Sequence, residues 1–167
     1  PAIPVDGIPV APEFTRDFGP EQQLLQRERK TGVAGWLWAI AYGVVLAIAE
    51  PLWQVTCVDT VGKKAAFIRQ AAAEIGLPNL HAEHSRVETL SAPPVDVITA
   101  RAFSSLADLT RLTQSLLAPG GVWMAMKGKR PDDELAALPP DVTAFHVEAL
   151  NVPGLEAERC LIWMRPR

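Results

Sequence analysis

A short apolar run that ends on an acid constrains this chain more than any other feature. The segment QVTCVDTVGKKAAFIRQ, from Gln54, runs to the acid Asp59, passes a Thr-Val-Gly link, and then continues with Lys63, Lys64 and helix-forming residues. This order predicts a strand followed by a helix at 61–75. In a parallel α/β sheet, an acid at the carboxyl end of the second strand can hold the hydroxyls of a bound ribose. Asp59 is therefore a candidate for binding a nucleotide-type cofactor.

Size and composition predict a globular chain in a reducing compartment. The 167 residues are 49% hydrophobic and 21% charged, which suits one domain with its own core. The net charge is −3, so nucleic-acid binding would need a local basic patch. Cys57 and Cys160 both lie in apolar runs, which favours two buried thiols over a disulfide. The histidines lack cysteine partners at metal-ligand spacing, so no metal site is expected.

The uncharged segment at 33–49, VAGWLWAIAYGVVLAIA, is open to more than one interpretation. Its length is at the lower limit for crossing a bilayer, but its two glycines and the following Pro51 favour buried core over membrane. It fits either one buried helix or a strand followed by a helix. The residues before it do not look like a signal peptide. We expect 1–32 to be an irregular N-terminal segment with a short helix, and 33–167 to be the main domain.

The rest of the chain alternates between strand and helix patterns. Strands are predicted at 54–59, 80–84, 95–100, 122–127, 142–150 and 160–165, and helices at 61–75, 104–117 and 132–138, with a turn at 119–121. Alternation of this kind predicts a parallel sheet covered by helices on both faces. The last two strands have no helix between them and should pair antiparallel. A parallel sheet closed by a terminal antiparallel hairpin resembles the Rossmann-like fold of class I S-adenosylmethionine-dependent methyltransferases.

Polar groups follow the ends of four successive predicted strands. Ligands bind at the carboxyl ends of strands in such sheets, and these ends carry Asp59, then SRVE with Glu88, then Arg101, then Lys127. Charges also gather at strand ends simply because solvent begins there. Their convergence from four strands is the stronger sign of a ligand site.

Two groups of basic residues are candidates for phosphate contact. Lys127, Lys129 and Arg130 follow a predicted strand, and a solvated loop is the plain alternative for them. Lys63 and Lys64 open a helix, where the helix dipole slightly disfavours cations. That position is unusual for stability alone, and it makes the two lysines plausible contacts for phosphate.

The motifs together resemble one known family. The chain carries VDTVGKKAAFIRQAAAEIGLPNL, SRVE, DVITARAFSSLADL, LLAPGGVWMAMKG and VPGLEAERCLIWMR. Their order and spacing are similar to those of the bacterial small-subunit ribosomal RNA guanine-N7 methyltransferases, the glucose-inhibited division protein B family. The likeness runs from about Val44 to the C-terminus.

The resemblance implies a reaction and a set of roles. The family transfers the methyl group of S-adenosylmethionine to N7 of a guanosine in 16S ribosomal RNA, so the expected partner is this RNA or the small-subunit particle. A monomer in the cytoplasm, without membrane attachment, is expected. N7 carries a free lone pair, so alignment and exclusion of water matter more than a general base. The residues matching the family's sites are Asp59 for the cofactor ribose, Val87 and Glu88 beside the adenine, Arg101 at the cofactor, and Lys127 at the RNA.

The family's glycine-rich loop has no match here. It has the form Asp-x-Gly-x-Gly-x-Gly-x-Pro-Gly, and counting back from Asp59 puts its first glycine on Trp36 and a cofactor-touching apolar position on Ala41. Only the last glycine survives, as Gly43. Three explanations are open: a divergent, non-catalytic RNA-binding homologue, an altered or truncated form that is inactive, or a sequence before about Gly43 that differs from the native protein.

Overall fold

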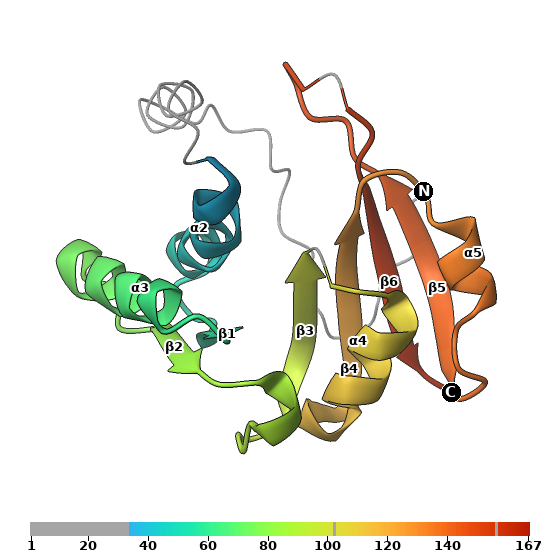
Figure 1. The fold of residues 1–167 in the computed structure, drawn as a ribbon, viewed down its shortest axis with the longest axis horizontal. Coiled ribbons are helices and arrows are strands. Elements are labelled where there is room, and N and C mark those ends of the chain that lie inside the picture. Colours follow the sequence, from blue (N-terminus) through green and yellow to red (C-terminus); the bar gives the residue numbers. More distant parts are fainter. Residues whose placement is uncertain (1–33, 102, 156) are drawn as a thin grey trace. The chain divides into compact units, whose positions relative to one another are not determined.

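Helices and strands alternate through the computed structural model, which describes residues 34–101, 103–155 and 157–167 (Figure 1). Residues 40–167 form one compact unit. The elements are α2 (Ala34–Ala49), β1 (Val55–Asp59), α3 (Gly62–Ile75), β2 (Leu80–His84), the 3-10 helix η2 (Val87–Thr89), β3 (Val95–Arg101), α4 (Leu106–Thr113), the 3-10 helix η3 (Gln114–Leu116), β4 (Leu117–Lys127), α5 (Asp132–Ala136), β5 (Val142–Ala149) and β6 (Cys160–Pro166).

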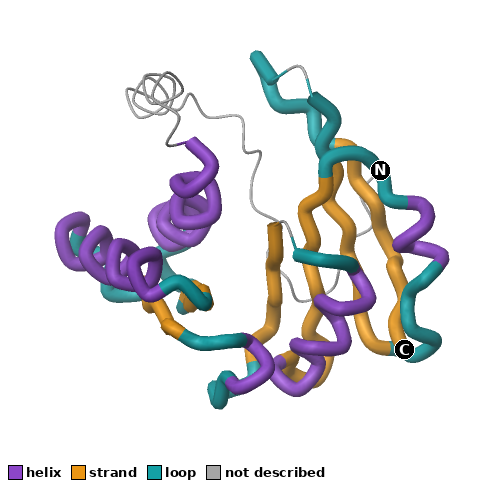
Figure 2. Tube along the Cα trace, viewed as in Figure 1, coloured by secondary structure: helices purple, strands orange, loops and turns teal. Residues whose placement is uncertain are grey.

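Parallel and antiparallel pairing divide the described strands into two sheets. Strand β1 pairs with β2 in parallel, and β3 pairs with β4 in parallel. Strand β6 then pairs antiparallel with both β4 and β5, which gives the order β3-β4-β6-β5. The predicted alternation and the terminal antiparallel hairpin are confirmed, and Figure 2 shows the strands in orange with helices between them.

The expected single sheet is not seen among these strands, because none of them joins β1 to β3. By the count from Asp59, the family's first strand would end near Ala34, and the described part of the chain is helical from that residue. Of the two interpretations of residues 33–49, the structure therefore shows the helix. None of the helices in the described ranges combines the length and apolar character that crossing a membrane requires. The proposed domain boundary at 32 and 33 stays a prediction, because residues 1–33 lie outside the description.

The turn predicted at 119–121 is wrong. These residues lie inside β4. On β3, Val95 pairs with Leu117 and Val97 pairs with Val122, so β4 has extra residues between the two pairs. The extra residues of β4 form a bulge, and Gly120 adopts a positive φ of 81° there. Proline and glycine gave a turn signal that is equally typical of a bulge within a strand.

A hydrophobic cluster holds α2, α3, β1 and β2 together. Its buried members are Ala47, Ala65, Ile68, Ala72, Leu80 and Ala82. At Gly43, α2 lies so close to β1 that a Cβ atom would overlap Sγ of Cys57. The surviving glycine of the family pattern thus serves close helix–strand packing in this chain.

Asn79 ties the end of α2 to the start of β1. Its buried side-chain Nδ2 donates to the carbonyl oxygens of Ala47 and Trp53, each at 3.0 Å. The last carbonyls of a helix have no partner within the helix, so a side-chain donor at this point satisfies groups that would otherwise be left unpaired.

Both cysteines, Cys57 and Cys160, are free thiols, as predicted, and burial raises the pKa of the Cys57 thiol.

A second core lies under α4, which covers β4 in Figure 1. Its buried members are Leu106, Leu109, Trp123, Ala125, Val142, Cys160, Ile162 and Met164. The indole nitrogen of Trp123 donates to Oγ1 of Thr113 at 2.8 Å, and that hydroxyl donates to the Leu109 carbonyl at 2.6 Å. The indole of Trp123 and the hydroxyl of Thr113 are therefore both hydrogen-bonded inside this core.

Substituting Gly43→Ala should lower the free energy of unfolding by about 1–3 kcal/mol, because the new methyl group overlaps Cys57. Helix propensity alone predicts a gain of up to about 1 kcal/mol for this change, so a loss identifies the steric contact. Urea unfolding measures it. Gly128→Ala is the control, since a Cβ there meets nothing within 4 Å. A smaller loss is expected in a Cys57→Ala background, and an equal loss there would contradict the explanation.

Candidate functional site

Parallel pairing brings the predicted residues to the carboxyl edge of each sheet. Asp59 ends β1 opposite His84, the last residue of β2, and η2 follows with Val87 and Glu88. In the other sheet, Arg101 ends β3 and lies opposite Met126 of β4. Lys127, the next residue, ends β4. Each sheet thus presents its candidate residues where ligands of α/β folds bind.

Asp59 is held by two donors at the start of α3. Its Oδ1 accepts from the backbone N–H of Val61 at 2.8 Å, and its Oδ2 lies 3.1 Å from Nζ of Lys64. Both side chains of this ion pair are 24% exposed. A carboxylate offers about four lone-pair sites, so Asp59 retains acceptor capacity for ribose hydroxyls. Lys64, predicted to contact RNA, is engaged by Asp59, whereas Lys63 is exposed in the first turn of α3.

Residues after β2 and β3 supply the other candidate cofactor contacts. Val87 is half-buried in η2, and Glu88 is exposed with Oε1 3.7 Å from Nη2 of Arg86. Arg101 is exposed at the end of β3. An apolar side chain beside an acid is a combination that can border a flat base and hold its polar edge.

Lys127 does not stand free at the end of β4. Its Nζ lies 2.8 Å and 2.9 Å from the two carboxylate oxygens of Glu134, and Glu134 also accepts from the backbone N–H of Leu106 at 2.8 Å. Glu134 was missed by the sequence reasoning. The available signal was an acid in the first turn of the predicted helix at 132–138, seven residues after Lys127.

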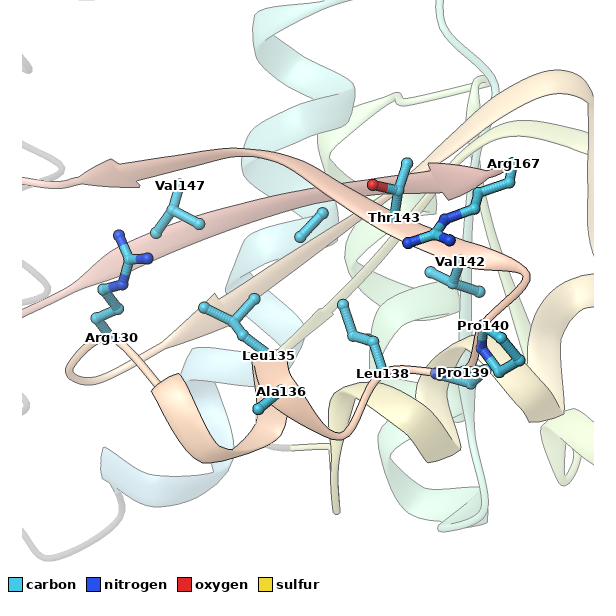
Figure 3. Close-up of a pocket in the computed structure, with 11 residues that line it drawn as sticks. Arg130, Leu135, Ala136, Leu138, Pro139, Pro140, Val142, Thr143, Val147 and Arg167 are labelled. Carbon is cyan, nitrogen blue, oxygen red and sulfur yellow. The ribbon is translucent and has the colours of Figure 1, made fainter.

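Lys129 and Arg130 are exposed in the loop after β4. Nε of Arg130 lies 2.7 Å from Oδ1 of Asp132, and both side chains of this pair are largely exposed. Figure 3 shows Arg130 and Arg167 at the two ends of a pocket beside α5 and β5, with apolar side chains such as Leu135 between them. The pocket has a volume of about 400 Å³. Among the predicted residues, Arg130 alone appears in its described lining.

The positions of the family's glycine loop lie on α2. Trp36 and Ala41 fall within this helix, and Gly43 is buried against β1. From residue 38 onward, the N–H groups of α2 bond to carbonyls four residues earlier in the helix, so they are not available to a ligand as loop amides are. The next residue, Tyr42, is half-buried, and desolvation raises the pKa of its hydroxyl, an effect that the Thr99 hydroxyl moderates. The strand ends therefore fit S-adenosylmethionine, but this segment does not.

No group of metal-binding side chains occurs in the part of the chain that the structure describes.

Comparisons with known proteins agree on family and fold. The family described as GidB, rRNA small subunit methyltransferase G, matches residues 42–162. The ribosomal RNA small subunit methyltransferase G of Leptothrix cholodnii is 64% identical over 125 residues, which cover 75% of this chain and 57% of that protein. The chain spans about half the length of the curated relatives that it matches.

Solved structures show the same fold at low sequence identity. TrmN from Thermus thermophilus has a TM-score of 0.59 at 21% identity, covering 87% of this chain and 48% of that one. The N-methyltransferase NodS from Bradyrhizobium japonicum has a TM-score of 0.58 at 12% identity, covering 87% of this chain and 98% of its own. The fold is thus that of the class I S-adenosylmethionine-dependent methyltransferases, as predicted.

Removing the Asp59 carboxylate should destabilise the protein more than removing its ion-pair partner. Asp59→Ala should lower the free energy of unfolding by about 1 kcal/mol or more, because it leaves the Val61 N–H without its charged acceptor. Lys64→Met should cost less than about 1 kcal/mol, because the pair is partly exposed. Urea titrations of both variants make the comparison. A larger loss for Lys64→Met would show that the ion pair, and not the backbone contact, holds this junction.

Proposed function

Because the chain belongs to the rRNA small subunit methyltransferase G family, we propose that its role is methyl transfer from S-adenosylmethionine to N7 of a guanosine in 16S ribosomal RNA. The observation that carries this proposal is the match over 42–162, which contains the polar residues at the ends of β1, β3 and β4. The proposed partner is the RNA itself or the small-subunit particle. The proposed setting is the cytoplasm, with the protein acting as a monomer.

The strand ends supply one part of the proposed cofactor site. Asp59 would accept the ribose hydroxyls while it keeps its contacts to Val61 and Lys64. Val87 and Glu88 would border the adenine, and Arg101 would stand beside the cofactor at the end of β3. S-adenosylmethionine supplies the methyl group. The chain's own part is to orient the two reactants and exclude water, since N7 has no proton to lose.

The segment at 36–43 limits this proposal. A glycine loop lets backbone amides approach the cofactor closely, whereas α2 has the amides of residues 38–43 bonded within the helix. We therefore expect weak cofactor binding by the chain with this segment. The second candidate function, a non-catalytic RNA-binding homologue, is favoured by this one observation. It would use Lys63, Lys64, Lys127, Lys129 and Arg130 for contact with the RNA.

Restoring the loop should restore cofactor binding. In a variant in which 34–43 follows the pattern Asp-x-Gly-x-Gly-x-Gly-x-Pro-Gly, S-adenosylmethionine should bind at least about tenfold more tightly than to the unchanged chain, a gain of roughly 1.4 kcal/mol. Isothermal titration calorimetry measures both affinities. Asp59→Ala in the restored variant is the matched control and should reduce the gain. Equal S-adenosylmethionine affinities of the restored variant and the unchanged chain would contradict the assignment of residues 34–43 as the position of the cofactor loop.

The two candidate functions differ in whether RNA binding leads to methyl transfer from the cofactor. The restored variant should methylate a 16S RNA transcript, and a transcript with 7-deazaguanosine at the target should accept no methyl group because it lacks N7. Tritium transfer from labelled S-adenosylmethionine provides the measurement. Salt-sensitive RNA binding without any transfer by the restored variant would favour the non-catalytic alternative.

A further inference from the structure

The ammonium of Lys127 lies in a junction of three elements. It contacts both oxygens of Glu134, and one of these oxygens also accepts the N–H of Leu106, the first residue of α4. The Lys127 side chain is 16% exposed and the Glu134 side chain 30%. The end of β4, the start of α4 and the short helix α5 therefore meet at one carboxylate.

Packing around this carboxylate limits its freedom. Leu106 is 1% exposed in the core beneath α4, and Leu135, next to Glu134, packs against the same core. A movement of the Glu134 carboxylate away from Lys127 would also disturb its contact with the Leu106 N–H. Because a carboxylate with three charge-assisted contacts is strongly preferred in one position, the junction fixes the Lys127 ammonium in place.

The same pairing decides what Lys127 can bind well. The Lys127–Glu134 pair is neutral as a unit, so an RNA phosphate at Lys127 would also face the negative Glu134. An ammonium has three donors, so Lys127 can still donate to an acceptor outside the pair. A neutral oxygen can accept a hydrogen bond from Lys127 without electrostatic repulsion from Glu134. Lys129 differs, because it is exposed and no described residue pairs with it.

We propose that Lys127 donates to a neutral oxygen on a base edge of the RNA, of the kind that guanine O6 presents, and that Glu134 is the residue that positions it. Phosphate contact then belongs to exposed cations such as Lys129. This inference rests on the proposed function, because it takes RNA as the substrate. It assigns Lys127 a part in choosing the base rather than in general affinity.

The salt dependence of RNA binding separates the two kinds of contact. Each phosphate contact contributes about 0.7–0.9 to the slope of log K against log salt. For a 16S RNA fragment with the target guanosine, Lys129→Met should lower this slope by about that amount. The double variant Lys127→Met/Glu134→Gln removes both charges of the neutral pair, so it should weaken binding and leave the slope unchanged. A fall in slope for this double variant equal to that for Lys129→Met would overturn the proposal.

Glu134→Gln tests the positioning role from the other side. The amide retains an oxygen for the Leu106 N–H but no longer neutralises Lys127, so the slope should steepen by about 0.7–0.9. Asp133→Asn removes an equal charge at an exposed position of the same helix and should leave the slope unchanged. Equal slopes for the two variants would refute the role of Glu134. The melting temperature of each variant shows that both remain folded at the binding temperature.

A base analogue identifies the acceptor. The fragment with 2-aminopurine at the target lacks O6, and the unchanged protein should bind it about tenfold more weakly than the guanine fragment. Lys127→Met should bind both fragments equally. If Lys127→Met still discriminates tenfold, Lys127 does not read the base. If the unchanged protein shows no salt-dependent RNA binding at all, the proposed function itself fails, and this inference falls with it.

Discussion

Parallel pairing of β1 with β2 and of β3 with β4 determines where the polar residues of this protein lie. Strands that run in the same direction end at the same edge, so side chains far apart in sequence become neighbours there. Asp59, Arg101 and Lys127 owe their positions to this constraint. The two cores keep the strands in register, and the loops after the strands need only be short. The candidate site is thus a property of the sheets more than of any one loop.

The segment that replaces the glycine loop is consistent with the packing it makes. Gly43 and the buried Ala47 let α2 lie close to the sheet of β1 and β2, and Gly43 stands directly against Cys57 of β1. A glycine in a cofactor loop and a glycine at a helix–strand contact meet the same requirement, the absence of a Cβ atom. The residue that survives from the family's pattern is therefore one that packing alone would retain.

Most of the fold followed from hydrophobic periodicity, but part of the site did not. The strands at 80–84 and 95–100 and the helix at 61–75 were predicted because apolar spacing and glycine stops are local signals. The bulge in β4 was mistaken for a turn, since both place glycine and proline together. The partners of Lys127 and Lys64 could not be predicted. Which acid reaches which cation depends on tertiary distances, and Glu134 becomes a partner only once α5 folds back on β4.

The hydrogen bonds of Asn79 have a consequence for the order of folding. This side chain stands just before β2, yet it donates to the carbonyls of Ala47 and Glu50 at the end of α2, about thirty residues earlier. During synthesis, α2 would leave the ribosome long before the residue that completes its C-terminal end. The segment from α2 through β2 should therefore become stable as one cooperative unit, with α2 docking late although it precedes β1 and β2 in the chain.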